Sequence, residues 1–192
     1  MFFKDQGQIE SLVWQNPLYM YRAGLLVRLS VRRKFERVGD IVDRTVKYGA
    51  DSLTMAVERR YCEDLSGFVQ RMHAMYNFEQ SDEIFREAIQ LYGLGLPKAG
   101  FLTQLLTGEI GCLDTHNLKM YDIDPKQFRI DGNWKSVEKA IMSYKAACLH
   151  CGGSEVLWNE WCRNLATIRP QVWPDAESVS NYHVQIVRGE TV

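Results

Sequence analysis

The chain has 192 residues, of which 46% are hydrophobic and 24% are charged, a globular composition that excludes a disordered chain. Its 23 Lys and Arg and 24 Asp and Glu leave a net charge of −1. That balance excludes a histone-like, strongly basic nucleic-acid binder, but it leaves room for one local basic face. The length predicts a single domain over residues 1–192.

The sequence indicates neither a membrane protein nor a secreted one. It has no apolar run of about 18 residues, and its first residues lack the charged and then apolar segments of a signal peptide. The odd number of cysteines, five, is typical of reduced thiols. We therefore expect an intracellular protein, in a prokaryotic or viral-host cytoplasm, with no membrane partner.

Helical spacing dominates the chain. Apolar residues recur every three or four positions over 9–29, 68–76, 84–89 and 137–144, whereas sustained alternation is nearly absent. We therefore predict an all-α fold with eight to ten helices. The predicted caps and stops of these helices are Ser81 before an acidic first turn, Asn133, the pair Gly152–Gly153, Ser154, and Asp175 or Ser178.

The segment 91–120 is the most informative one. Gly93–Gly95 is predicted to form a tight turn, and Pro97 fits the first position of a helix that continues from Lys98 to Leu106. A helix–turn–helix unit of this kind exposes backbone N–H groups at a helix N-terminus, where a phosphate binds well. Lys98 adds a positive charge beside that site.

A second glycine-containing turn, Gly108–Gly111, follows that helix. The chain then reaches Asp114, which lies where the next helix begins, and continues with Thr115 and His116. Considered alone, the first turn is an ordinary connection between two helices, and Asp114 is an N-cap residue. His116 lies two residues beyond Asp114, so on a helix their side chains diverge. A polar cap or a DNA contact is its expected role.

Together the two segments resemble the helix-hairpin-helix DNA glycosylase superfamily, the HhH-GPD group. The hairpin of that family typically reads Leu-Pro-Gly-Val-Gly-Arg-Lys-Thr-Ala, and a Val-Asp-Thr-His motif follows it. Here Ala99 stands four residues after Gly95, and Asp114, which opens Asp-Thr-His, stands 19 residues after Gly95, similar to the family spacing. The resemblance is close over 91–120 and looser over the rest of the chain.

The resemblance implies two helical halves that flank a cleft. The central half spans 20–115, with the hairpin at 84–106, and the second half combines 1–19 with 116–192. Double-stranded DNA would lie across the cleft mouth, with one nucleotide flipped into the cleft. Asp114 would be the catalytic carboxylate near the deoxyribose C1′, where it stabilises the positive charge on the sugar or activates the nucleophile. The implied DNA contacts are Gly93, Leu94, Gly95, Pro97, Lys98 and His116.

The chain departs from the family at the position of a catalytic lysine. Bifunctional members place a Schiff-base lysine two residues after the second hairpin glycine, where this chain has Pro97. Lys98 comes one residue later and is turned by about 100° on a helix. Lys98 is therefore a weaker catalytic candidate, with a phosphate contact or a solvated surface as the alternative, and we expect no strong lyase activity. Tyr92 also replaces a family proline.

A second departure concerns metals and other cofactors. Some members bind an iron–sulfur cluster through four cysteines near the C-terminus, but Cys148, Cys151 and Cys162 have a different spacing. We expect buried free thiols, no metal and no other cofactor. A zinc site that uses His150 or His183 is the alternative.

A basic run offers a second DNA contact. Between Arg22 and Arg37, six Lys or Arg occur within 16 residues, against one acid, Glu36. On a helix several of these side chains share a face, and we assign Arg32 and Arg33 to the DNA backbone. A solvated face paired with nearby acids is the alternative. The five tryptophans are expected to be mainly core, with one or two available to stack on a flipped base.

These observations favour a monomeric DNA base-excision N-glycosylase that acts on a flipped damaged or modified base. The first alternative is a base-modifying enzyme on the same scaffold, similar to viral and bacteriophage proteins that attach amino acids or amines to hypermodified pyrimidines. The second is a non-catalytic DNA-binding or virion-associated protein. The near-neutral net charge disfavours that second alternative, and the presence of Asp114 favours the enzymes.

Overall fold

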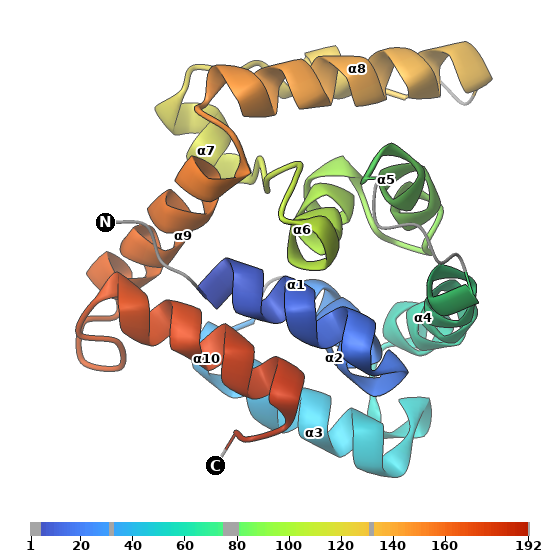
Figure 1. The fold of residues 1–192 in the computed structure, drawn as a ribbon, viewed down its shortest axis with the longest axis vertical. Coiled ribbons are helices and arrows are strands. Elements are labelled where there is room, and N and C mark those ends of the chain that lie inside the picture. The colour runs from blue at the N-terminus through green and yellow to red at the C-terminus, as the bar shows by residue number, and fades with distance from the viewer. Residues whose placement is uncertain (1–4, 31–32, 75–80, 131–132, 192) are drawn as a thin grey trace.

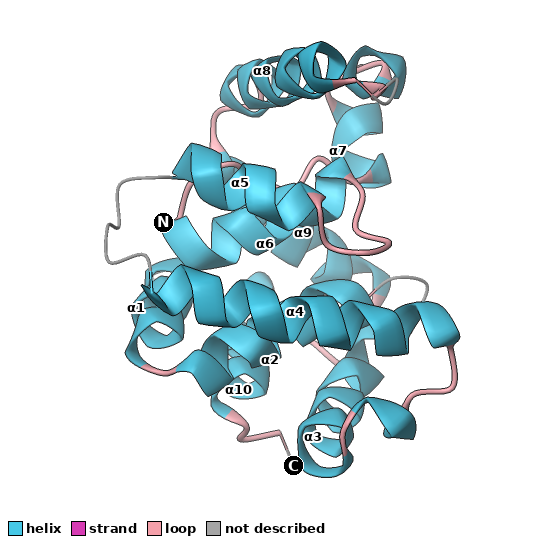
Figure 2. Ribbon diagram, turned by 90° about the vertical axis from the view of Figure 1, so that its right-hand side faces the viewer, coloured by secondary structure: helices cyan, strands magenta, loops and turns pink. Residues whose placement is uncertain are grey.

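The computed structural model describes residues 5–30, 33–74, 81–130 and 133–191, and every regular element within these ranges is a helix (Figure 2). The α-helices are α1 (Asp5–Gln15), α2 (Pro17–Leu29), α3 (Val38–Tyr48), α4 (Ala56–Ala74), α5 (Ser81–Ile89), α6 (Leu96–Thr107), α7 (Thr115–Met120), α8 (Trp134–His150), α9 (Ser154–Ile168) and α10 (Ala176–Arg188). Short 3₁₀ helices are η1 (Phe35–Arg37), η2 (Ala50–Ser52) and η3 (Pro125–Phe128). The prediction of an all-α fold with eight to ten helices is confirmed for the described ranges.

The helices pack around α6, which lies near the centre of the molecule (Figure 1). α8 crosses one end and α3 lies at the other, while α1 and α10 run side by side across the front. α2 packs against α1, α4, α6 and α10. Residues from the two expected halves are thus in direct contact where α2 meets α10. No helix in the described part of the chain is both long and apolar enough to cross a membrane.

α6 is buried along most of its length. Every residue from Ala99 to Leu106 is buried, so this helix has no solvent-facing side along that stretch. It packs against α1, α2 and α5, which fixes its two ends firmly in the molecule. Lys98 stands in its first turn, and the turn at Gly108 follows its last residue.

Two of the predicted N-caps are confirmed. The side chain of Asn133 accepts a hydrogen bond from the Ser136 N–H at 2.9 Å and caps α8. The side chain of Asp175 accepts one from the Ser178 N–H at 2.8 Å and caps α10. Both contacts satisfy one of the N–H groups that a helix start leaves without an intrahelical partner. The predicted stop at Gly152–Gly153, just after α8, is also confirmed, with φ of +94° and +91°.

Two predicted caps are wrong. Ser81 and Ser154 are the first helical residues of α5 and α9 rather than residues that precede them. The Ser81 hydroxyl donates instead to a Glu109 carboxylate oxygen at 2.6 Å, and the Ser154 hydroxyl donates to the Gly108 carbonyl. Both serines therefore hold the turn that follows α6, a long-range role that local sequence does not indicate.

Candidate functional site

One open cavity, here named the Asp114 cleft, brings together residues from distant parts of the chain. Its volume is about 440 Å³, within the range of roughly 300–1,000 Å³ that small-molecule sites occupy. Both catalytic candidates predicted from the sequence, Asp114 and Lys98, line it. The lining consists of Ser30, Arg33, Lys34, Phe35, Glu36, Lys98, Asp114, Trp161, Asn164, Leu165, Ile168, Arg169 and Trp173.

Asp114 is a helix cap and a cleft residue at once. One carboxylate oxygen, Oδ1, accepts a hydrogen bond from the Asn117 N–H at 2.9 Å, which caps α7 as predicted. The side chain is half-buried at the cleft wall. Its other oxygen accepts no hydrogen bond from the residues described, so one negatively charged oxygen is available to a bound molecule.

Lys98 enters the cleft rather than solvent. Its Nζ donates to the Ser30 hydroxyl at 3.1 Å and lies 5.2 Å from the centre of the Phe101 ring. α6 begins at Leu96, so Pro97 is its second residue and not its first. The side chain is half-buried and lines the same cavity as Asp114, which favours a role in the cleft over the alternative of a solvated surface lysine.

The glycine turn, residues 90–95, connects α5 to α6 and is held by side chains of α2 and α4. Gly93 has a φ of +72°, which favours glycine, whereas Gly95 is extended with a φ of −83°. Arg28 of α2 donates to the Gly93 carbonyl at 3.0 Å, and Asp64 of α4 accepts the Tyr92 N–H at 3.2 Å. The N–H groups of Gly93 and Gly95 have no hydrogen-bond acceptor within the described ranges.

The basic run does not form one helical face. α2 ends at Leu29, so the run is divided between this helix, a turn and η1. Arg22 is 4% exposed, donates to the Ile186 carbonyl at 2.6 Å and pairs with Asp43. The prediction of a shared basic surface is therefore wrong for this arginine, which is a core residue.

The two arginines assigned to DNA from this run differ in outcome. Arg33 lines the cleft and pairs with the buried Glu58 of α4 at 2.6 Å. Arg32 lies outside the described residues. Lys34 also lines the cleft, so Arg33 and Lys34, which directly precede η1, both supply cations to this site.

Three aromatic residues form part of the cleft wall. Phe35 lies 5.1 Å from Trp161 and 5.6 Å from Trp173, as measured between ring centres. Trp158, one turn before Trp161 on α9, is only 2% exposed and donates to Ser180 instead. The sequence did not predict which tryptophans face a ligand. The spacing of Trp161, Leu165 and Ile168 was an available signal, because it gives α9 a second apolar stripe.

His116 and the cysteines do not join the cleft. His116 is half-buried on α7 and is not a lining residue. Cys148, Cys151 and Cys162 are buried and form no disulfide bond. Within the described ranges no three His, Cys, Asp or Glu side chains are grouped so that they could hold a metal ion. The geometry therefore gives no support to the alternative of a zinc site.

His183 is buried in an aromatic cluster beneath the cleft. Its ring centre lies 4.7 Å from those of Phe35 and Trp161. Nδ1 lies 2.8 Å from the Val179 carbonyl, so this nitrogen carries the proton and donates. Burial, with a smaller effect of the Lys98 charge, lowers the pKa of His183 to about 3. The imidazole is therefore a neutral packing group at neutral pH.

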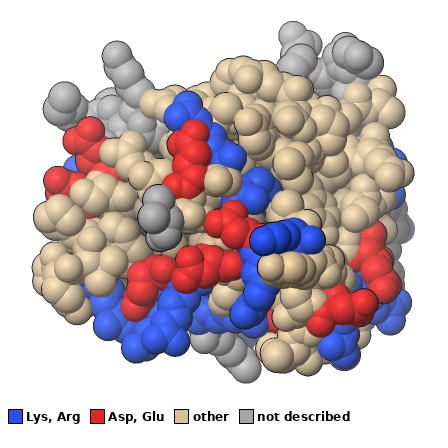
Figure 3. Space-filling view, turned by 90° about the horizontal axis from the view of Figure 1, so that it is seen from below, with Lys and Arg blue, Asp and Glu red and all other residues tan. Residues whose placement is uncertain are grey.

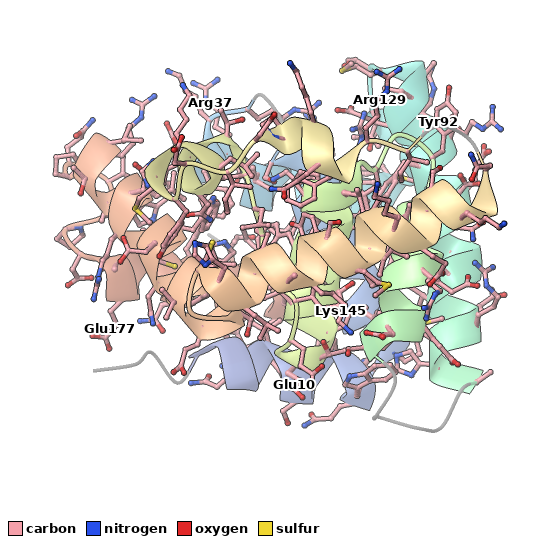
Figure 4. All side chains as sticks on the ribbon, turned by 90° about the horizontal axis from the view of Figure 1, so that it is seen from above. Glu10, Arg37, Tyr92, Arg129, Lys145 and Glu177 are labelled. Carbon is pink, nitrogen blue, oxygen red and sulfur yellow. The ribbon has the colours of Figure 1, made fainter. Side chains whose placement is uncertain are left out.

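The charged surface is uneven. The face seen from below in Figure 3 carries Lys and Arg along one edge beside a band of Asp and Glu. Seen from above, Arg37 of η1 and Tyr92 of the glycine turn project along the same edge of the molecule (Figure 4). The Tyr92 ring is covered by the Arg60 guanidinium at 4.2 Å.

No protein-family model, curated protein or solved structure matches this chain.

Proposed function

We propose that this protein is a DNA base N-glycosylase in which the Asp114 cleft receives a flipped nucleotide. The observation that carries the proposal is that Asp114 and Lys98, the two catalytic candidates of the sequence resemblance, line one cavity together with Trp161 and Trp173. A cavity that combines a carboxylate, cations and aromatic rings suits a nucleotide, because bases stack on aromatic side chains and phosphates attract cations.

The glycine turn supports the same proposal as a grip for the DNA backbone. The N–H groups of Gly93 and Gly95, which have no acceptor within the described ranges, precede α6, whose N-terminus favours a phosphate. Lys98 stands in the first turn of the same helix and lines the cleft. In this proposal, α5, the turn and α6 act as a helix-hairpin-helix unit that holds one strand while the neighbouring nucleotide enters the cleft.

Asp114 supplies the chemistry in this proposal. As the bond between base and sugar breaks, positive charge builds up on the deoxyribose ring. A carboxylate at the wall of a restricted cleft stabilises that charge more effectively than it does in bulk water, or it accepts a proton from the attacking water molecule. The cap bond to Asn117 fixes one oxygen and leaves the second for either role.

Lys98 fits an electrostatic role better than a nucleophilic one. Its contacts with the Ser30 hydroxyl and the Phe101 ring use the side chain as a cation, whereas a Schiff base requires the free amine. We therefore propose base release by water without strand cleavage. Borohydride reduction during the reaction should trap no covalent complex with DNA.

Base release tests the proposal. The wild type, Asp114→Asn and Asp175→Asn are incubated with duplexes that carry uracil, oxidised, alkylated or hydroxymethylated bases, and free bases are measured by mass spectrometry. Asparagine preserves an N-cap, so both variants should fold, and Asp175 makes the matching cap on α10 outside the cleft. We expect release by the wild type and by Asp175→Asn, and a loss of at least about 100-fold in Asp114→Asn.

Two results would contradict the proposal. Equal release by wild type and Asp114→Asn would remove Asp114 from the reaction. No release from any of these duplexes, with DNA binding intact, would favour base modification or simple DNA binding instead.

A further inference from the structure

The segment that delivers Asp114 to the cleft is itself buried. Residues Ile110 to Leu113 run through the interior between α6 and α9 without forming a helix. Ile110 has a φ of +52°, a backbone conformation that a β-branched residue rarely adopts. Such a segment keeps its shape only where its backbone groups are held by other parts of the molecule.

Tyr144 of α8 holds this segment at two points. Its hydroxyl donates to the Gly111 carbonyl at 3.0 Å and accepts the Leu113 N–H at 2.8 Å. Leu113 is bonded directly to Asp114, so the second contact fixes the Cys112–Leu113 peptide group, one residue before the cleft carboxylate. The Tyr144 side chain is completely buried, and water therefore cannot replace it in these contacts.

Two other side chains hold the segment one residue further back. The Gln104 side chain accepts the Cys112 N–H at 3.2 Å, and the Asn117 side chain donates to the Cys112 carbonyl at 2.7 Å. These contacts keep the segment inside the protein when the tyrosine hydroxyl is removed. The hydroxyl therefore affects orientation near Asp114 more than it affects folding.

The Tyr144 ring is held independently of its hydroxyl. It packs against Phe85 and Phe128, with ring centres 5.4 Å and 5.3 Å away. Gly100 of α6 makes room for the contact, because a Cβ at that position would lie 2.6 Å from the Tyr144 oxygen and 2.8 Å from the Gly111 carbonyl oxygen. A phenylalanine at 144 can thus occupy the same place without the hydroxyl.

We propose that Tyr144 is a positioning residue that orients the Asp114 carboxylate in the cleft through its hydrogen bond to the Leu113 amide. This inference rests on the proposed function for its catalytic consequence, although the positional part stands without it. Burial also keeps the pKa of Tyr144 well above its ordinary value, so the hydroxyl remains neutral and able to donate over the pH range of an assay.

The positional part is tested by hydrogen exchange in Tyr144→Phe. The Asn117 N–H reports the cap made by Asp114, and the Ser178 N–H reports the matching cap made by Asp175. We expect faster exchange at Leu113 and Asn117 and unchanged exchange at Ser178. Tyr61→Phe is the matched control, since Tyr61 is also completely buried and its hydroxyl donates to the Gly24 carbonyl at 2.9 Å, a contact between α4 and α2 that involves no residue of this segment.

The catalytic part is tested by single-turnover base release. Displacing a reacting group by about 1 Å costs up to roughly 100-fold in rate, so Tyr144→Phe should slow base release by about 10- to 100-fold while DNA affinity stays the same. Tyr61→Phe should keep the wild-type rate. In an Asp114→Asn background, Tyr144→Phe should leave the residual rate unchanged, because the group it orients is gone.

The outcomes separate this inference from the proposed function. Protected Asn117 exchange in Tyr144→Phe would overturn the inference, whatever the activity. Faster exchange at Asn117 with no base release by the wild type would contradict the proposed function and keep the positional role. An equal rate loss in Tyr61→Phe would show that Tyr144 acts only through the general stability of the protein, and it would also overturn the inference.

Discussion

Two aspartates of this chain show how one local rule serves two different purposes. Asp114 and Asp175 cap helices with nearly the same geometry, at 2.9 Å and 2.8 Å from the amide they accept. Only Asp114 lines the cleft. Sequence predicted both as caps, because the residue type and its place before a helix are sufficient for that. The cleft position depends on where α6, α8 and α9 hold the preceding segment.

At the residue scale, His183 makes stability depend on pH. Its pKa is about 3 in the folded protein, because burial disfavours the charged ring, against about 6.5 when exposed. At pH values above the exposed pKa, the imidazole is neutral in both the folded and the unfolded protein, so His183 causes no loss of stability. As the pH falls below it, only the unfolded state binds the proton, so folding loses free energy by up to about 1.4 kcal/mol per pH unit.

The test of this prediction is urea denaturation at pH 7 and pH 5 for the wild type and His183→Leu. The wild type should lose about 2 kcal/mol more than the variant between the two conditions. The other three histidines are common to both proteins and cancel in the comparison. An equal loss in both would contradict the assignment of a neutral buried imidazole.

Arg22 provides a second prediction at the residue scale. Its replacement by Met leaves Asp43 without its cationic partner and the Ile186 carbonyl without this donor, so we expect stability to fall by about 3 kcal/mol. Arg44→Met, at an exposed position of α3, should change stability by less than about 0.5 kcal/mol. Denaturant titration checks both. Stability unchanged in Arg22→Met would contradict its structural role.

At the scale of elements, helix type and several ends were predictable, whereas the end of α2 was not. From Leu25 to Arg37 the basic run contains no glycine or proline, so its local pattern suggested a longer helix. α2 nevertheless ends at Leu29, where Lys98 contacts Ser30 and Arg33 pairs with Glu58. These partners lie far away in the sequence, and the place where the chain turns is set by them rather than by local propensity.

The glycine turn gives the prediction at this scale. Gly93→Ala and Gly49→Ala both place a side chain at a positive φ, of +72° and +78°, and should each cost about 1–3 kcal/mol of stability. Only Gly93 belongs to the proposed DNA grip, where an added Cβ also lies 3.1 Å from Val57. Fluorescence anisotropy should show DNA affinity reduced about tenfold in Gly93→Ala alone. Equal affinity in both variants would contradict the grip.

At the scale of the whole molecule, the sequence did not predict which residues form the aromatic wall of the cleft. Its aromatic wall combines Phe35 of η1, Trp161 of α9 and Trp173 of the segment that follows. No local periodicity relates residues that far apart. Asp114 and Lys98 were predicted as site residues because they belong to a short motif. Asn164 and Arg169 belong to no motif, so the sequence did not indicate them.

Net charge leads to a prediction about salt. With a net charge of −1, DNA binding depends on local cations. Four cationic side chains line the cleft, and within the described ranges only Arg33 has a carboxylate partner. The other three, Lys34, Lys98 and Arg169, can therefore each contact a phosphate. Neutralising three phosphates gives a slope of about −3 in a plot of log K against log salt concentration. A slope near zero would contradict binding through the DNA backbone.

The central claim is that the Asp114 carboxylate stabilises a positive sugar in the cleft, and one binding measurement tests it without knowledge of the base. A duplex with a protonated pyrrolidine in place of one nucleotide imitates that charge, and a neutral tetrahydrofuran in the same place is its control. The wild type and Asp175→Asn should bind the pyrrolidine duplex at least about 100-fold more tightly, and Asp114→Asn should show no preference. Equal affinity of the wild type for both duplexes, or a preference that survives in Asp114→Asn, would contradict the claim.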